Sequence, residues 1–349
     1  SPQIHPCRPS CACRPRPSRQ SNDLWLVSAT DDWRFMGAAL ALASRGIGTA
    51  FPNPSVGCVI AKDGRVAGRG WTQPGGRPHA EAVALAQAGD AANGATAYVT
   101  LEPCAHVSPR GPSCADSLIA AGVARVVIAA HDPDPRTDGD GVARLRAAGI
   151  AVTTGVRDAE AEQQLAGFLT RLKLGRPHIT LKLAVSIDGA IAMADGRSQW
   201  ITGERARADA HLERARADLI VVGRGTWDAD GPTLDVRLPG LEARSPRIGM
   251  VGRGDGLPGH VTHFPDLAAL TADPALCVLV EGGMGLAASL LAADLVDALI
   301  LMRAPILIGA GRTLGDIGLA DLAQAHDRWR AEPIVTLGAD RIERFIRTR

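Results

Sequence analysis

Short apolar runs alternate along residues 36–154 with segments whose apolar positions recur at helical spacing. The first pattern is typical of buried strands, and the second is typical of helices that cover a sheet. The predicted strands are 56–61, 95–101, 124–130 and 150–154, and the predicted helices are 36–45, 78–88, 113–121 and 140–148. Because strands and helices alternate, this part of the chain is predicted to fold as an α/β domain.

A second α/β unit follows the Gly/Pro break at 175–177. Its predicted strands are 178–185, 218–223, 276–280 and 298–302, and its predicted helices are 203–216 and 285–293. The length of 349 residues agrees with two domains, since it exceeds what one hydrophobic core usually serves. We therefore expect a first domain at 36–156, a charged linker at 157–176 and a second domain at 177–349.

The first 35 residues differ in composition from the rest of the chain. They are rich in Pro, Arg and Ser and have no apolar period, so residues 1–35 are expected to be a disordered leader. A small metal knuckle made of His5, Cys7, Cys11 and Cys13 is the alternative. Disorder is favoured, because prolines separate these residues.

Composition and charge narrow the class of protein. An apolar fraction of 46% and a charged fraction of 21% are typical of a folded globular chain. The net charge of +1 argues against a general binder of polyanions, so we expect no nucleic-acid partner. No apolar run is long enough to span a membrane or to act as a signal peptide. Seven cysteines scattered over a long chain indicate thiols rather than disulfides, and a cytoplasmic location is expected.

One set of residues carries a specific chemistry. His79 and Glu81 lie at the start of a predicted helix, Cys104 follows a predicted strand, and Cys114 begins the next helix. One His and two Cys form a three-ligand zinc set that leaves a fourth position for water. Zinc lowers the pKa of such a water, and Glu81 could carry its proton to a leaving amine. This H-x-E and P-C pattern resembles that of zinc base deaminases, although nine residues separate the cysteines here.

A structural zinc site is the alternative interpretation of the same residues. Structural zinc usually has four protein ligands, and His106 could supply the fourth. In that case Glu81 would have no role, so the catalytic interpretation is favoured. His106 is then expected to contact substrate or solvent.

The chain from about residue 36 to residue 349 resembles a known family, the bifunctional riboflavin-biosynthesis deaminase–reductases. The resemblance depends on several long motifs that occur in the family's order. They are PNPSVGCVI (52–60), HAEAVAL (79–85), TLEPCAH (100–106), PSCADSLIAAGVARVV (112–127), TLKLAVSIDGAIA (180–192), SQWITG (198–203) and LVEGGMGLAASLL (279–291).

The resemblance implies a fold, two reactions and two cofactors. The first domain would be a cytidine-deaminase-like three-layer α/β/α unit, and the second a dihydrofolate-reductase-like α/β unit. The first would remove the pyrimidine-ring amino group of 2,5-diamino-6-ribosylamino-4(3H)-pyrimidinone 5′-phosphate with Zn²⁺. The second would use NADPH to reduce the ribosyl side chain to ribityl. Family members often associate through the reductase half, so a homo-oligomer is a further expectation.

The resemblance also implies roles for individual residues. His79, Cys104 and Cys114 would bind zinc, and Glu81 would be the catalytic proton carrier. The residues expected to contact NADPH are Ala184, Trp200, Thr226, Asp230 and Gly283. The residues expected to contact substrate are Asn53, Arg110, Ser198, Arg214, Leu234, Arg237 and Glu281.

Two departures from the family pattern keep other functions open. The loop between the cysteines is one residue longer, which could shift Arg110, and the stretch between Arg237 and Glu281 is shorter. The chain could therefore be a deaminase whose reductase domain is degenerate and only supports assembly. A non-catalytic, zinc-stabilised binding module is a third possibility.

Overall fold

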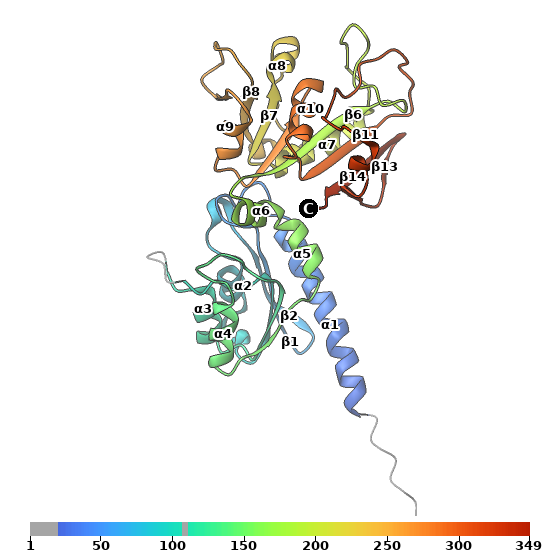
Figure 1. The fold of residues 1–349 in the computed structure, drawn as a ribbon. Helices are drawn as coiled ribbons and strands as arrows, with labels where there is room; N and C mark the ends of the chain where they lie inside the picture. Colours follow the sequence, from blue (N-terminus) through green and yellow to red (C-terminus); the bar gives the residue numbers. More distant parts are fainter. Residues whose placement is uncertain (1–19, 107–110) are drawn as a thin grey trace, which may run out of the picture.

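The structure is a computed structural model that describes residues 20–106 and 111–349, with side chains from residue 29 onward. It consists of two α/β halves, one below the other in Figure 1, and each half is built around one sheet. No helix within the described ranges is long and apolar enough to cross a membrane. Residues 1–19 of the expected leader (1–35), which include its cysteine cluster, lie outside the described residues.

In the first half, the described residues form a five-stranded sheet with the order β2-β1-β3-β4-β5. β1 pairs antiparallel with β2 and with β3, while β3, β4 and β5 are mutually parallel. A two-residue turn, Asp63-Gly64, joins β1 to β2 in a hairpin, and an Asp-Gly pair is typical of such turns. The strands are β1 (Gly57–Lys62), β2 (Arg65–Trp71), β3 (Thr96–Leu101), β4 (Arg125–Ala130) and β5 (Ala151–Thr153).

Helices cover both faces of this sheet and complete the expected three layers. One layer contains α1 (Gln20–Ala43) and α5 (Asp158–Gln164), which pack on each other and on the central strands. The opposite layer contains α2 (Ala80–Ala88), α3 (Cys114–Ala120) and α4 (Asp140–Ala147). Short 3₁₀ turns lie at Pro74–Gly76 and Gly89–Ala92.

Two glycines of β2 let α2 lie unusually close to the sheet. A Cβ at Gly68 would lie 2.1 Å from the Ala84 carbonyl oxygen, and a Cβ at Gly70 would lie 2.4 Å from that of Ala80. No side chain fits in these gaps, so glycine is required at both positions. The close packing fixes the start of α2, which carries His79 and Glu81.

The long first helix corrects one expectation from the sequence. The leader was expected to be disordered up to residue 35, but α1 begins at Gln20. Contacts with residues far along the chain explain the difference. Arg125 donates two hydrogen bonds to the Asp32 carboxylate, at 2.8 and 2.7 Å, and the Phe35 ring packs against Tyr98 with centroids 5.1 Å apart.

The second half contains a larger sheet, nine-stranded in the described part of the chain, with the order β12-β14-β11-β6-β10-β7-β8-β9 and β13 paired to β14. The strands from β11 to β9 in this order are parallel, whereas β14 pairs antiparallel with β11, β12 and β13. The strands are β6 (His178–Val185), β7 (Leu219–Gly223), β8 (Arg247–Val251), β9 (Val261–Phe264), β10 (Cys277–Glu281), β11 (Ala298–Arg303), β12 (Trp329–Ala331), β13 (Val335–Leu337) and β14 (Asp340–Arg347).

The helices of this half are short apart from α7, and α6 joins the two halves. They are α6 (Ala166–Leu174), α7 (Glu204–Arg216), α8 (Arg224–Asp230), α9 (Leu267–Ala272) and α10 (Met284–Ala292), with 3₁₀ turns at Glu242–Arg244 and Leu322–Ala325. The shortened stretch between Arg237 and Glu281 retains two parallel strands, β8 and β9, which the sequence pattern did not predict.

The Asp32–Arg125 pair should anchor α1 to the sheet. The Asp32 side chain is 10% exposed and that of Arg125 is 26% exposed. Replacing Asp32 by Asn leaves the guanidinium without its charged partner, so Asp32→Asn should lower the free energy of unfolding of the first half by about 2 kcal/mol. Urea titration followed by circular dichroism measures this change.

Asp31 provides a matched control. It forms an exposed pair with Arg34, so Asp31→Asn should change the stability by less than about 0.5 kcal/mol. Equal effects of the two substitutions would contradict the anchoring role.

Candidate functional site

Three elements of the first half bring one imidazole and two thiols together. His79 is the N-cap residue of α2, Cys104 follows β3, and Cys114 is the first residue of α3. Their donor atoms all lie within 4.8 Å of one another. His79 Nδ1 lies 3.3 Å from Cys114 Sγ and 3.8 Å from Cys104 Sγ. The structure therefore gathers the three residues that the sequence predicts as zinc ligands.

The surroundings favour a thiolate at Cys104. A hydrogen bond from the Cys114 thiol is the main cause that lowers the pKa of Cys104 to about 4, and His79 adds to the effect. The Cys114 backbone N–H also donates to Cys104 Sγ at 3.4 Å. Thiolate is the form of cysteine that binds metal ions.

This donor set fits zinc. One nitrogen and two sulfurs are donors that zinc prefers, and in catalytic sites three protein ligands leave one position open. Among the described side chains, His106 is not part of the set. The alternative of a four-ligand structural site with His106 is therefore not supported by the geometry.

Glu81 lies beside this set without belonging to it. Its side chain is buried, with 3% of the residue exposed, and burial raises the pKa of its carboxyl group. It shares a hydrogen bond with Cys114. A buried carboxyl group with a raised pKa accepts a proton more readily than an exposed one, which suits a group that takes up and releases protons during a reaction.

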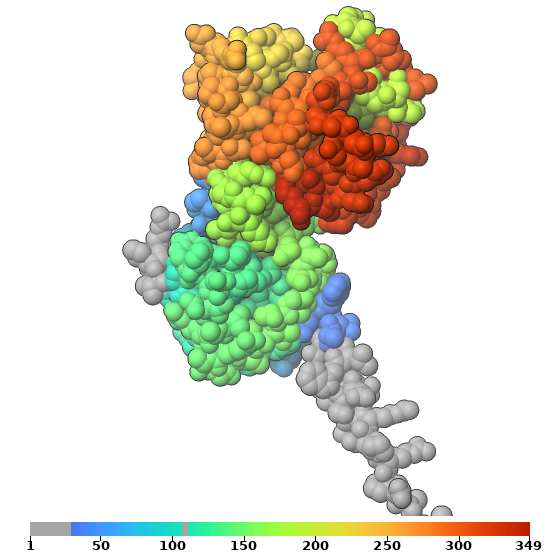
Figure 2. Space-filling view, in the orientation of Figure 1, coloured from blue at the N-terminus to red at the C-terminus, as the bar shows by residue number. Residues whose placement is uncertain are grey.

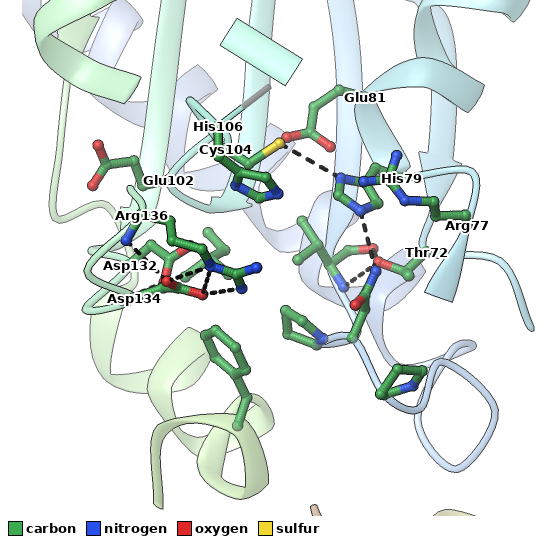
Figure 3. Close-up of a pocket in the computed structure, with 16 residues that line it drawn as sticks. Thr72, Arg77, His79, Glu81, Glu102, Cys104, His106, Asp132, Asp134 and Arg136 are labelled. Atoms are coloured by element: carbon green, nitrogen blue, oxygen red, sulfur yellow. Dashed lines mark hydrogen bonds and ion pairs between the residues drawn. The ribbon is translucent and has the colours of Figure 1, made fainter. Parts of the chain in front are cut away.

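A cavity of about 580 Å³ opens onto these residues. Figure 3 shows His79, Cys104 and Glu81 on one side of the cavity and Asp132, Asp134 and Arg136 on the other. A cavity of this size suits a small-molecule substrate. Asn53 lines the cavity as well; its Nδ2 lies 3.2 Å from His79 Nε2 and donates to the Gly76 carbonyl at 2.8 Å.

The acidic side of the cavity was not found from the sequence. Arg136 donates hydrogen bonds from Nε and Nη2 to the Asp134 carboxylate. The Asp134 backbone N–H donates to the Asp132 carboxylate at 3.0 Å. Asp132 is 6% exposed. His106 also faces this cavity, and its Nδ1 is buried with no hydrogen-bond partner. Arg110, expected to contact substrate, lies outside the described residues.

In the second half, two expected substrate residues contact each other. Arg214 donates to both oxygens of Glu281, at 2.7 and 3.0 Å, and to the Asp235 carbonyl at 2.9 Å. Lys182, which the sequence analysis did not select, lies 3.7 Å from Glu281. Burial alone would raise the pKa of Glu281, but Lys182 and Arg214 outweigh it and lower the pKa to about 2. Glu281 is therefore a carboxylate held between two cations.

The remaining expected positions lie around this pair and at the ends of nearby strands. Leu234 is buried next to Asp235, and the Arg237 side chain is 57% exposed. Gly283, the N-cap of α10, donates its backbone N–H to Thr226 Oγ1 at 3.0 Å. Ala184 lies on β6, Ser198 is half-buried and Asp230 is exposed at the end of α8. Trp200 is 65% exposed and stacks on the Arg207 guanidinium at 4.8 Å.

Comparison with known proteins agrees with the division of the chain into two halves with separate sites. Residues 29–130 match the family described as "Cytidine and deoxycytidylate deaminase zinc-binding region". Residues 177–253 and 251–340 match the "RibD C-terminal domain". The chain thus joins a zinc-binding deaminase domain to a RibD reductase domain.

Individual relatives extend over most of the chain. The riboflavin biosynthesis protein RibD of Haemophilus influenzae is 39% identical over 363 residues, 90% of this chain and 97% of that protein. The RibD of Escherichia coli is 52% identical over 214 residues, which are 61% of this chain and 58% of that protein. A Thermotoga maritima deaminase/reductase structure matches with a TM-score of 0.81 and 28% identity, covering 92% of this chain and all of that one. The chain belongs to the RibD family of bifunctional riboflavin-biosynthesis enzymes.

Asp132 should make the stability of the chain depend on pH. Burial raises its pKa to about 6, whereas an unfolded Asp has a pKa of about 3.9. The folded chain thus binds this proton more tightly, and the free energy of unfolding falls as the pH rises from about 4 through 6. Asp132→Asn should raise the free energy of unfolding at pH 7 by at most about 3 kcal/mol. It should also reduce the dependence of this free energy on pH between about 4 and 6, as measured by denaturant titration.

The control is Asp63→Asn, in the exposed hairpin turn, which should leave the pH profile unchanged. A lower stability of Asp132→Asn at pH 7 would show that the ionised carboxylate stabilises the fold instead.

Proposed function

We propose that the chain catalyses two consecutive steps of riboflavin biosynthesis. The first is hydrolytic deamination of 2,5-diamino-6-ribosylamino-4(3H)-pyrimidinone 5′-phosphate, and the second is reduction of the ribosyl side chain to ribityl by NADPH. The observation that carries this proposal is a His/Cys/Cys set with a free, buried Glu81 beside it. The related Thermotoga structure is named for this pair of reactions, a diaminohydroxyphosphoribosylaminopyrimidine deaminase and a 5-amino-6-(5-phosphoribosylamino)uracil reductase.

In the deaminase half, each residue has one task. His79 Nδ1, Cys104 Sγ and Cys114 Sγ would hold the metal ion, and Asn53 lies 3.2 Å from the other ring nitrogen of His79. Zinc in such a set lowers the pKa of a bound water and so makes a nucleophile available near neutral pH. Glu81 takes a proton from the attacking water and passes it to the departing amino group, so that water and substrate give a ring carbonyl and ammonia.

In the reductase half, the contact between Arg214 and Glu281 separates two roles among the proposed substrate residues. One role is to hold another residue of the site in place, and the other is to bind the substrate phosphate. Arg214 already has two bonds to a carboxylate, so its task is to hold Glu281 in place. Arg237 is exposed, and its one ion pair among the described residues is a distant contact with Asp235 at 3.8 Å. Arg237 is therefore the guanidinium that we assign to the substrate phosphate, with Ser198, Leu234 and Glu281 forming the rest of the site.

We assign the NADPH site to the turn at the start of α10 and the strand ends next to it. Gly283 and Thr226 are joined by a hydrogen bond, and glycine at an N-cap lets a cofactor approach the backbone closely. Ala184, Trp200 and Asp230 are the other proposed contacts. The protein would place the nicotinamide against the ribosyl carbon, and the cofactor would supply the hydride.

Two alternatives are less well supported. A degenerate reductase half would be expected to lose part of its sheet, but β8 and β9 extend it without interruption, and the Glu281 cluster is assembled. A non-catalytic module would have no use for a buried carboxyl group beside an open donor set. A metal site with thiolate ligands needs reduced cysteines, which favours the cytoplasm as the location of this enzyme.

The proton-transfer role of Glu81 can be tested by Glu81→Gln. The amide keeps the shape of the side chain but cannot accept a proton, so ammonia release should fall by about 10²- to 10⁴-fold. Zinc content should remain at the wild-type level because Glu81 is not a ligand. Metal analysis and a coupled ammonia assay measure the two quantities.

The reduction of separately supplied deaminated intermediate is the internal control and should be unchanged in Glu81→Gln. Loss of zinc from this variant would mean that Glu81 belongs to the metal shell. An unchanged rate of ammonia release would remove Glu81 from the proton transfer, whereas no ammonia release by the wild type would favour the non-catalytic module.

The phosphate role of Arg237 predicts a KM effect. Arg237→Ala removes a charged hydrogen bond, so the KM of the reductase for the deaminated phosphate should rise about tenfold or more, with little change in the KM for NADPH. The absorbance of NADPH, followed as the cofactor is oxidised, measures both constants. Arg330→Ala, on the edge strand β12, should behave as the wild type, and a wild-type KM in Arg237→Ala would remove Arg237 from the site.

A further inference from the structure

Helix α6 is shared by the two halves of the molecule. Leu165 and Leu169 are buried in the core of the deaminase half, and Phe168 packs against the same core. Phe168 also lines the 580 Å³ cavity that contains His79 and Glu81. In Figures 1 and 2 this yellow-green segment lies at the junction, with one half on either side. The segment that was expected to be a linker therefore supplies part of a catalytic cavity.

The reductase half holds α6 at an unusually close distance. Gly167 is buried, and a Cβ at this position would lie 2.4 Å from Cys277 Sγ and 3.0 Å from the Leu276 carbonyl oxygen. Residues 276 and 277 are themselves fixed, because both of their backbone N–H groups donate to the Asp218 carboxylate, at 2.9 and 2.8 Å. Gly167 thus rests against a rigid part of the reductase sheet.

Arg171, in the last turn of the same helix, joins the helix to the reductase half by hydrogen bonds. Its Nη2 donates to the Asp273 carbonyl and, at 2.7 Å, to the Ala275 carbonyl. Its Nη1 donates to the Gly175 carbonyl at 3.0 Å. These bonds join the end of α6 to the segment that leads into β10, so the helix cannot move without the reductase half.

The deaminase cavity and the junction between the halves share part of their lining. A second cavity of about 40 Å³ lies between the halves, and Gly167, Arg216 and Cys277 are among its lining residues. Asn53, Pro54 and Phe168 line both cavities. A shift of α6 at the junction would therefore move Phe168 in the catalytic cavity.

We propose that Phe168 is a substrate-binding residue of the deaminase and that the reductase half positions it through the contact of Gly167 with Cys277. This inference rests on the proposed function. An aromatic ring in the wall of the cavity offers a flat apolar face to a pyrimidine ring, which aromatic side chains bind by stacking. Gly167, Arg171 and Cys277 are positioning residues, since they act on the cavity only through Phe168.

The test uses the full chain and three variants: Gly167→Ala, Cys277→Ala and the double variant. Gly167→Ala adds a methyl group that collides with the Cys277 sulfur, so the KM of the deaminase should rise about tenfold, while its kcat and the reductase KM for the supplied intermediate stay within about twofold. Alanine is the better helix former, so a loss of helix propensity cannot cause this effect. Cys277→Ala alone removes this contact without displacing α6, so it should raise the KM by less than Gly167→Ala does, and the double variant should return the KM to the level of Cys277→Ala.

Several results would overturn the proposal. They are a wild-type deaminase KM in Gly167→Ala, a fall in kcat without a change in KM, or a double variant that does not recover. Ammonia release by the wild-type chain tests the proposed function separately. If the wild type is active and the deaminase KM of Gly167→Ala is unchanged, only the positioning of Phe168 by the reductase half is overturned.

Direct substitution of Phe168 covers the case in which Gly167→Ala does not fold. Phe168→Ala should raise the deaminase KM about tenfold, within the range measured when stacking aromatics are removed, and it should keep the zinc content and the reductase constants. Phe168→Leu retains the apolar volume but not the flat ring, so its KM should lie between those of the wild type and Phe168→Ala. An unchanged KM in Phe168→Ala would rule out a substrate contact.

Discussion

The close packing of α2 on β2 is the constraint on which the deaminase site depends. Gly68 and Gly70 let the helix backbone approach the sheet, and this fixes the helix start where His79 and Glu81 lie. The end of β3 and the start of α3 bring Cys104 and Cys114 to the same point. With three soft donors in place, the neighbouring carboxyl group remains free for proton transfer rather than for metal binding.

The two halves form a connected unit rather than two domains on a flexible tether. Helix α6 contributes Leu169 to one core, as does its N-cap residue Leu165, and the helix contacts Cys277 and the carbonyl groups near it in the other half. This arrangement links the geometry of the deaminase cavity to the structure of the reductase half. Fusion of the two activities in one chain then has a structural consequence in addition to the shared expression of both enzymes.

The sequence predicted the local features well and the long-range ones poorly. The metal set could be found because H-x-E, P-C and a helix-borne Cys form a specific pattern, and the main strands could be found from their apolar runs. The prediction that the chain is disordered up to residue 35 was wrong, because a residue far along the chain stabilises α1. That residue is Arg125, which lies 93 positions beyond its partner Asp32. The pairing of Arg214 with Glu281, the burial of Asp132 and the position of Phe168 also depend on tertiary packing, which no local spacing reveals. Lys182 had one available signal, its place two residues before Ala184 on a predicted strand.

The central claim is an open zinc site with one imidazole and two thiolate ligands. X-ray absorption spectroscopy of the zinc-loaded full chain tests it most directly. We expect two sulfur atoms at about 2.3 Å, one imidazole and one further light atom that is not from a side chain, and a spectrum that His106→Ala leaves unchanged. A second imidazole in the shell, lost in His106→Ala, would instead show a closed, four-ligand structural site.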